Sequence, residues 1–165
     1  MNKQELQEML DELNMPLLDA VKTIHPIFLN LCSKDELLDF IGKIPTYYFG
    51  FVYELSEEAQ LKLLHSRKIP GIIQYIQNPT KAALFEAVKI TPSNLRWVKN
   101  PSDELQEYAI NIQSCAIGDI ENPSENAQLL AISKNKNAIG WIKNPTKIAL
   151  KKHMELYGKV QNKTE

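Results

Sequence analysis

The tripeptide Asn-Pro-Ser/Thr occurs four times in the second half of the chain, and the copies are evenly spaced. They begin at Asn78, Asn100, Asn122 and Asn144. Self-similarity at a fixed period, here about 22 residues, is typical of proteins built from stacked structural repeats. A repeat array offers a long binding surface in place of a single reactive pocket. The period therefore bears on function as well as on fold.

Small and aliphatic residues recur at fixed places in each repeat, which we number from its proline as position 1. Positions 5 and 9 lie about one helical turn apart, and small residues there let helices approach closely. Position 5 holds Ala83, Leu105, Ala127 and Ala149, and position 9 holds Ala87, Ala109, Ala131 and His153. Positions 17 and 20 are aliphatic in every copy, as at Ile73 and Ile76. That spacing predicts a second, shorter helix.

The proline, asparagine and hydroxyl residues of the repeat predict where the two helices begin and end. Proline is favoured in the first helical turn, and either the Asn before it or the Ser/Thr after it can cap the helix, so the start is open by two residues. We expect the break between the helices near position 14, where Pro92 stands. Ser114 and Lys136 hold that position in later copies, so the break there rests on neighbouring Asn and Ser residues.

Weaker copies extend toward the N-terminus, where the intervals are slightly longer. The corresponding hydroxyl residues are Ser33, Ser56, Thr80, Ser102, Ser124 and Thr146. We expect an N-terminal helical cap over 1–32, five to six repeats over 33–157 that are clearest over 56–150, and a flexible tail over 158–165. The predicted fold is all-α, a right-handed α-solenoid of alternating longer and shorter helices.

The Asn-Pro-Ser/Thr unit, the following Ala-x-x-x-Ala-Val/Ile and the Ile-x-x-Ile-x-Asn-Pro return resemble short helical repeats of phage and large-virus proteins. Their period is similar to that of variant leucine-rich repeats, in which an α-helix alternates with a 3-10 helix. The resemblance covers roughly residues 56–150 and implies no shared catalytic residues. The iron–sulfur cluster of some variant leucine-rich proteins needs a cysteine cluster, which Cys32 and Cys115 do not supply. The resemblance implies a phage-encoded inhibitor of a host or defence protein.

Charge is nearly balanced overall but unevenly distributed. The net charge is −1, with −6 over residues 1–66 and +6 over residues 133–165. We therefore expect weak or no nucleic-acid binding and no attraction to an anionic membrane. The longest largely apolar stretch, residues 44–55, is too short to span a bilayer, and the N-terminal residues show no signal-peptide pattern. We expect a cytoplasmic protein, in the host cytoplasm if a phage encodes it.

No pattern in the chain indicates catalysis. His25, His65 and His153 have no partners at metal-ligand spacing, and no glycine-rich phosphate loop or nucleophile elbow is present. The acidic pairs Glu57-Glu58 and Asp103-Glu104 fall in first helical turns, which the helix dipole favours. We predict no enzyme activity, no catalytic residues, no cofactor and no metal.

Position 19 carries large aromatics, and two arrangements are compatible with them. This position holds Tyr75, Trp97 and Trp141, and in one copy Asp119. The rings either complete the core beside position 20 or form an exposed stripe that docks a partner, since Trp, Tyr and Arg are enriched at binding hot spots. Asp119 favours exposure, because acids are rarely placed at buried positions. The candidate protein-binding residues are Tyr75, Arg96, Trp97, Lys99, Trp141 and Lys143.

A second aromatic cluster lies over residues 47–53. Tyr48 and Phe51 fall at positions 17 and 20, which predicts that they are buried in the core. Tyr47, Phe49 and Tyr53 then point elsewhere, either against the N-terminal cap or outward as an interface. The function that the sequence favours is non-catalytic binding of a protein. The alternatives are a nucleic-acid-binding repeat protein that uses the basic C-terminal end, and a self-associating structural or virion scaffold.

Overall fold

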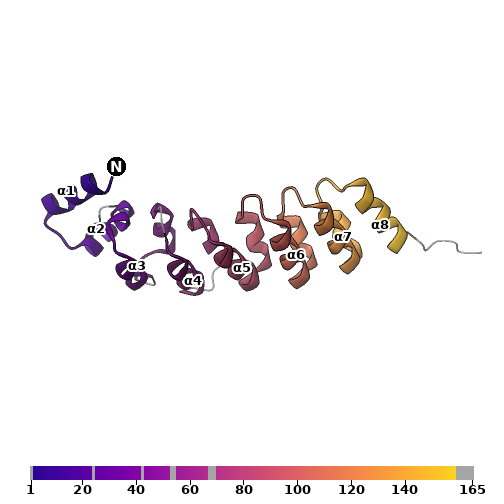
Figure 1. Cartoon of the computed structure of the whole chain (residues 1–165), viewed down its shortest axis with the longest axis horizontal. Coiled ribbons are helices and arrows are strands. Elements are labelled where there is room, and N and C mark those ends of the chain that lie inside the picture. Colours follow the sequence, from indigo (N-terminus) through magenta and orange to yellow (C-terminus); the bar gives the residue numbers. More distant parts are fainter. Residues whose placement is uncertain (1, 24, 42, 53–54, 67–69, 159–165) are drawn as a thin grey trace, which may run out of the picture. The chain divides into compact units, whose positions relative to one another are not determined.

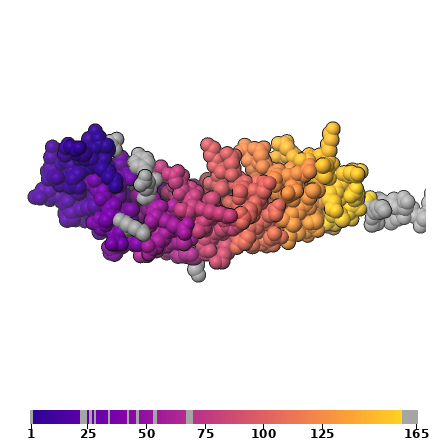
Figure 2. Space-filling model, viewed as in Figure 1, coloured from indigo at the N-terminus to yellow at the C-terminus, as the bar shows by residue number. Residues whose placement is uncertain are grey.

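A computed structural model describes residues 2–23, 25–41, 43–52, 55–66 and 70–158. Over these ranges the chain is helical, and the only β-type pairing there is an isolated bridge between Ile41 and Ile44. The predicted all-α class is confirmed. The residues group into two compact units, 1–86 and 87–165, which divide inside one helix. In each unit, side chains fill the space between the ribbons (Figures 1 and 2).

α-Helices alternate with short 3-10 helices, which we label η. The first unit contains α1 (Lys3–Leu13), α2 (Leu17–Thr23), η1 (Pro26–Leu31), α3 (Lys34–Phe40), η2 (Thr46–Phe51), α4 (Glu57–Ser66), η3 (Ile72–Tyr75) and the start of α5 (Lys81–Ile90). The second contains the end of α5, then η4 (Pro92–Trp97), α6 (Asp103–Ile112), η5 (Ser114–Asp119), α7 (Glu125–Lys134), η6 (Lys136–Trp141) and α8 (Lys147–Tyr157). The 3-10 helices η4, η5 and η6 begin at position 14, where the sequence predicts the break.

The α-helices of the second unit are capped by the hydroxyl residue of each tripeptide. The backbone N–H of Leu105 donates to Ser102 Oγ at 3.3 Å, and that of Ala149 donates to Thr146 Oγ1 at 3.1 Å. This geometry decides between the two possible caps, since it leaves the asparagine two residues outside the helix. Asn100 instead adopts a left-handed backbone conformation with φ 52°, which asparagine tolerates better than most residues.

Two layers form the second unit. α6 packs on α7 and α7 on α8, while η4 packs on η5 and η5 on η6. The residues between these layers are those that the period predicts, with Ala109, Ala131 and Ala149 all fully buried. Ile117 and Ile120 of the η5 segment are buried as well. These alanines, together with the buried Leu105 at position 5 of α6, therefore form the seam along which the longer helices pack.

A buried glutamine at position 6, which the apolar period does not predict, joins consecutive repeats. Gln106 Nε2 donates to the carbonyl of Pro101 at 2.8 Å, and its Oε1 accepts from the backbone N–H of Ser124 at 2.9 Å. Gln128 repeats the arrangement one period later, with bonds of 3.0 Å to Pro123 and 2.9 Å from Thr146. Each amide thus satisfies backbone groups at two helix starts, which would otherwise cost free energy when buried.

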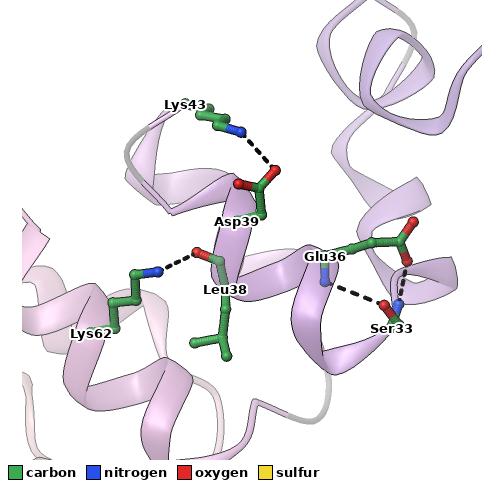
Figure 3. Close-up of polar contacts among 6 residues, drawn as sticks. All are labelled: Ser33, Glu36, Leu38, Asp39, Lys43 and Lys62. Carbon is green, nitrogen blue, oxygen red and sulfur yellow. Dashed lines mark hydrogen bonds and ion pairs between the residues drawn. The ribbon is translucent and has the colours of Figure 1, made fainter.

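The first unit uses the same devices with less regularity. Ser33 and Glu36 form a capping box at the start of α3, and Lys62 of α4 donates to the carbonyl of Leu38 at 2.8 Å (Figure 3). α3 packs on α4, η1 on η2 and η2 on η3. Gln60 accepts from the backbone N–H of Thr80 at 2.8 Å, so the glutamine bridge is present here too.

The prediction that Tyr48 and Phe51 are the buried pair of η2 is wrong by one residue. Phe49 and Val52 are buried, at 0% and 3% exposure, whereas Tyr48 is half-buried and Phe51 is 39% exposed. The buried pair stands seven and four residues before Ser56, the same spacing as in the regular repeats. The extra residue of this repeat therefore lies before η2, because the 3-10 helix keeps its register with the helix that follows it.

The other aromatics of this cluster point in different directions. Tyr47 is exposed, and its ring meets that of Tyr48 edge-on, with centroids 4.8 Å apart. The ring of Phe51 meets that of His25 edge-on at 5.2 Å. The sequence predicts that Phe49 points away from this core position, and the ring instead lies fully within the core. Tyr53 lies outside the described residues.

Candidate protein-binding groove

A groove of about 520 Å³ lies in the second unit, along the turns that follow η4 and η5. The turn after η4 leads into α6, and the turn after η5 leads into α7, so the groove is built from one repeat position seen twice. It is lined by Leu95, Arg96, Trp97, Val98, Lys99, Asn100, Pro101, Gln106, Asp119, Ile120, Glu121 and Asn122. Three of the six predicted site residues, Arg96, Trp97 and Lys99, therefore come together here.

The indole of Trp97 lies at the surface and not in the core. Its side chain is 48% exposed, while its neighbour Leu95 is buried at 1%. Leu95 and the half-buried Val98 occupy positions 17 and 20 of the repeat. The core of this repeat is complete without the ring, so the core alternative for Trp97 is wrong.

An ion pair crosses the groove beside Trp97. Arg96 Nη2 lies 2.6 Å from Asp119 Oδ1, and the Asp119 side chain is only 17% exposed against 54% for Arg96. The sequence prediction that Asp119 marks an exposed position is thus only partly right, because its carboxylate is turned toward the guanidinium. With Lys99 and Glu121 also lining the groove, its charges are mixed. The pair joins two successive repeats across the groove.

Trp141 and Lys143 lie one repeat further on and do not line the groove. Trp141 is 37% exposed, so it too is a surface residue. It lies against Gly118, since a Cβ added to that glycine would stand 3.3 Å from Trp141 Cβ. The pair Arg96–Asp119 shows the same relation: position 18 of one repeat meets position 19 of the next. Lys143 is exposed.

Tyr75 belongs to the other compact unit. It is half-buried, and its ring centroid lies 6.5 Å from that of Tyr47. Gly50 lies beneath it, with Tyr75 O 3.9 Å from the position of an added Cβ. Position 18 therefore meets position 19 of the next repeat in this unit as well. Of the six predicted site residues, Arg96, Trp97 and Lys99 line the groove.

The histidines act as local structural groups. His25 Nδ1 accepts from the backbone N–H of Ile27 at 3.2 Å, and a nitrogen of His65 lies 3.4 Å from Glu86 Oε1. His153 Nε2 lies 3.0 Å from the carbonyl oxygen of Lys136. Within the described ranges, no three His, Cys, Asp or Glu side chains gather as a metal site. In the same part of the chain, no helix combines the length and apolar character needed to cross a bilayer.

Comparison with protein-family models, with curated proteins and with solved structures finds no match to this chain.

Proposed function

We propose that this chain is a non-catalytic repeat protein that binds another protein through the groove beside Trp97. The observation that supports this most is the indole itself. It is 48% exposed, it lines a groove of about 520 Å³, and the repeat's core does not need it. Exposing a large aromatic ring has no benefit for folding, whereas tryptophan beside arginine is the composition of a binding hot spot.

The proposal includes the arrangement of the repeats as a right-handed α-solenoid with residues 1–32 as its N-terminal cap. Support comes from the strict alternation of α- and 3-10 helices along the repeats and from the glutamine side chains that link one helix start to the next. An array of this kind displays the same turn once per repeat. A partner could then be held by several adjacent turns, of which those after η4 and η5 form the groove.

The mixed charge of the groove favours a protein partner over a nucleic acid. Arg96 is neutralised by Asp119 at 2.6 Å, and Glu121 lines the same groove as Lys99. A polyanion gains affinity mainly by collecting several uncompensated cations, which this groove lacks. A flat or convex protein surface with one apolar projection and a few polar groups suits it better. An inhibitor of a host or defence protein is one protein of this class.

The test is capture of partners from cells of the source organism by the immobilised full chain. The wild-type chain is compared with Trp97→Ala and with Ile112→Ala, a matched control whose side chain is also 48% exposed and does not line the groove. We expect one protein to be retained by wild type and by Ile112→Ala and lost with Trp97→Ala. Equal retention by all three chains would contradict the proposal. So would submicromolar binding of DNA or RNA at physiological salt.

A further inference from the structure

α8, the last helix of the second unit, presents a row of apolar side chains that no other described element covers. Leu150 and Met154 are 44% and 68% exposed. With Lys147, Lys151 and Glu155 they line a shallow depression of about 450 Å³. α8 packs on α7, as the yellow end of the second unit shows (Figure 1), and its residue Ala149 is fully buried.

The equivalent row is buried in α6 and α7, the two preceding helices of the second unit. Leu150 and Met154 stand at positions 6 and 10, where α6 has Gln106 and Ile110 and α7 has Gln128 and Ile132, all buried. In α7 this row meets the next repeat at Gln128, whose Oε1 accepts from the backbone N–H of Thr146 at 2.9 Å. The row on α8 is therefore equivalent to a helix-packing surface, and no described element covers it.

The 3-10 layer of the last repeat is uncovered in the same direction. Gly118 is covered by Trp141, but a Cβ added to Gly140, one period later, would meet no atom within 4 Å. Both layers of this repeat thus carry a surface that is covered in the preceding repeat and is not covered here by described residues. An uncovered apolar face of this kind marks an interaction site.

α1, the first helix of the chain, carries a complementary surface. Met9 and Leu13 lie one turn apart and are 39% and 42% exposed. Beside them lies an acidic row, Glu8 and Glu12, both exposed. One lysine and four acids give α1 a net charge of −3, whereas three lysines and one acid give α8 +2. Charge of opposite sign on two surfaces both steers association and fixes their register.

The rows also match in position around each helix. At about 100° per residue, the lysine row 147/151 lies about 60° to one side of the 150/154 row, and the acidic row 8/12 lies about 100° to the other side of the 9/13 row. When two parallel helices pack with the 150/154 row facing the 9/13 row, rows with opposite offsets lie on the same side of the contact. The lysine row and the acidic row then lie next to each other. The buried flanks, which contain Ala149 on α8 and Leu6 on α1, then also fall on one common side.

We infer that this protein associates head to tail, with α1 of one copy packing in parallel on the 150/154 row of α8 of a second copy. The lysine row meets the acidic row, and α1 takes the place of the next repeat's helix. The two surfaces are different, so the contact is heterologous, and each copy keeps one free surface for a further copy unless the assembly closes on itself.

The experiment is sedimentation of the full chain over a range of concentrations. We expect wild type to associate as concentration rises, and to do so less when salt is raised from about 0.05 M to about 0.5 M, which screens the charged rows. Met9→Glu breaks the α1 surface and Met154→Glu breaks the α8 surface. Each variant alone should weaken association about tenfold or more, because an unpaired charge is placed in an apolar contact.

Mixing Met9→Glu with Met154→Glu is the decisive experiment. Each retains the surface that the other lacks, so an equimolar mixture should form a 1:1 dimer that does not grow further. Ile148→Glu is the control, since Ile148 is 52% exposed on a different side of α8 and its substitution should leave association unchanged. A wild-type chain that stays monomeric at every concentration overturns the inference. Undiminished association of Met9→Glu also overturns it, because it would show an α8–α8 contact.

Discussion

The two compact units use one repeat plan with different regularity. Residues 87–165 contain hydroxyl caps at a constant interval, and each cap, alanine seam and 3-10 helix recurs at its expected position. In residues 1–86 the intervals from Ser33 to Ser56 and from Ser56 to Thr80 are longer and unequal. In η2 the buried pair keeps its distance to the following cap, and the extra residue lies before it. The comparison shows that, from η2 onward, the number of residues between a 3-10 helix and the start of the next α-helix is constant. The extra residues lie before the 3-10 helix.

The largest effect that tests this comparison is expected at Phe49. Phe49→Ala should destabilise the protein by about 3–5 kcal/mol, because it removes a fully buried ring. Phe51→Ala removes the same group from a position that is 39% exposed and should cost clearly less. Chemical denaturation followed by circular dichroism measures both. A larger loss for Phe51→Ala than for Phe49→Ala would contradict this register and restore the forward count from Ser33.

The glutamine bridge should matter nearly as much in the regular unit. Gln106→Leu keeps the volume but leaves the Pro101 carbonyl and the Ser124 N–H without their partner. Each unsatisfied buried group of this kind costs about 1–3 kcal/mol. Gln113→Leu, at an exposed position outside the helix, is the matched control and should change the free energy of unfolding little. If both variants melt like wild type, water replaces the amide and the bridge is not a source of stability.

The helix caps provide a smaller and sharper test. Ser102→Ala removes the acceptor of the Leu105 N–H, and losing such a cap should cost about 1 kcal/mol. Asn100→Ala should not remove a cap. It should still destabilise, because alanine tolerates the left-handed backbone of this position less well than asparagine does. Asn100→Gly separates the two causes: it lacks the amide and tolerates a positive φ, so it should melt near wild type if Asn100 has no capping role.

A pH dependence in the first unit has the smallest effect near neutral pH, where the Cys32 thiol is protonated in both the folded and the unfolded state. Burial, with Glu36 nearby, raises the pKa of Cys32 from 9.0 to about 12. Since the folded-state pKa lies above the unfolded one, the stabilising contribution is fully present below about pH 9 and is lost as the pH rises toward 12. Between these values wild type should lose stability faster than Cys32→Val. Parallel curves for the two chains would show that the thiol is accessible to water.

Much of the fold is predictable because equivalent residues recur at the same position in several repeats. Ala109 and Ala131 mark the seam, and Pro92 marks the helix break, each at its expected place. The burial of Phe49 was not predictable by counting repeat positions forward from Ser33. The sequence alone does not show where in the repeat the extra residue lies. The role of Gln106 was missed because a polar residue adds nothing to an apolar period. Its signal is a glutamine four residues after the cap, which also occurs at Gln60 and Gln128.

The candidate site was predictable only where its residues are neighbours in sequence. Arg96, Trp97 and Lys99 lie within four positions, and they share the groove. The pairing of Arg96 with Asp119 joins two successive repeats and depends on how their 3-10 helices are offset in space. Trp141 stands at the same repeat position as Trp97, in the same unit, and does not line the groove. A shared repeat position therefore predicts a similar environment, and not membership of one groove.

Trp97 is, in our proposal, a surface residue available to a partner, and its fluorescence tests this most directly. Trp141→Phe leaves Trp97 as the only tryptophan of the full chain, so its emission can be measured without interference. We expect a red-shifted spectrum that acrylamide quenches readily, in a chain that melts near the wild-type temperature. A blue-shifted spectrum protected from acrylamide would place the indole in the core and contradict the proposal.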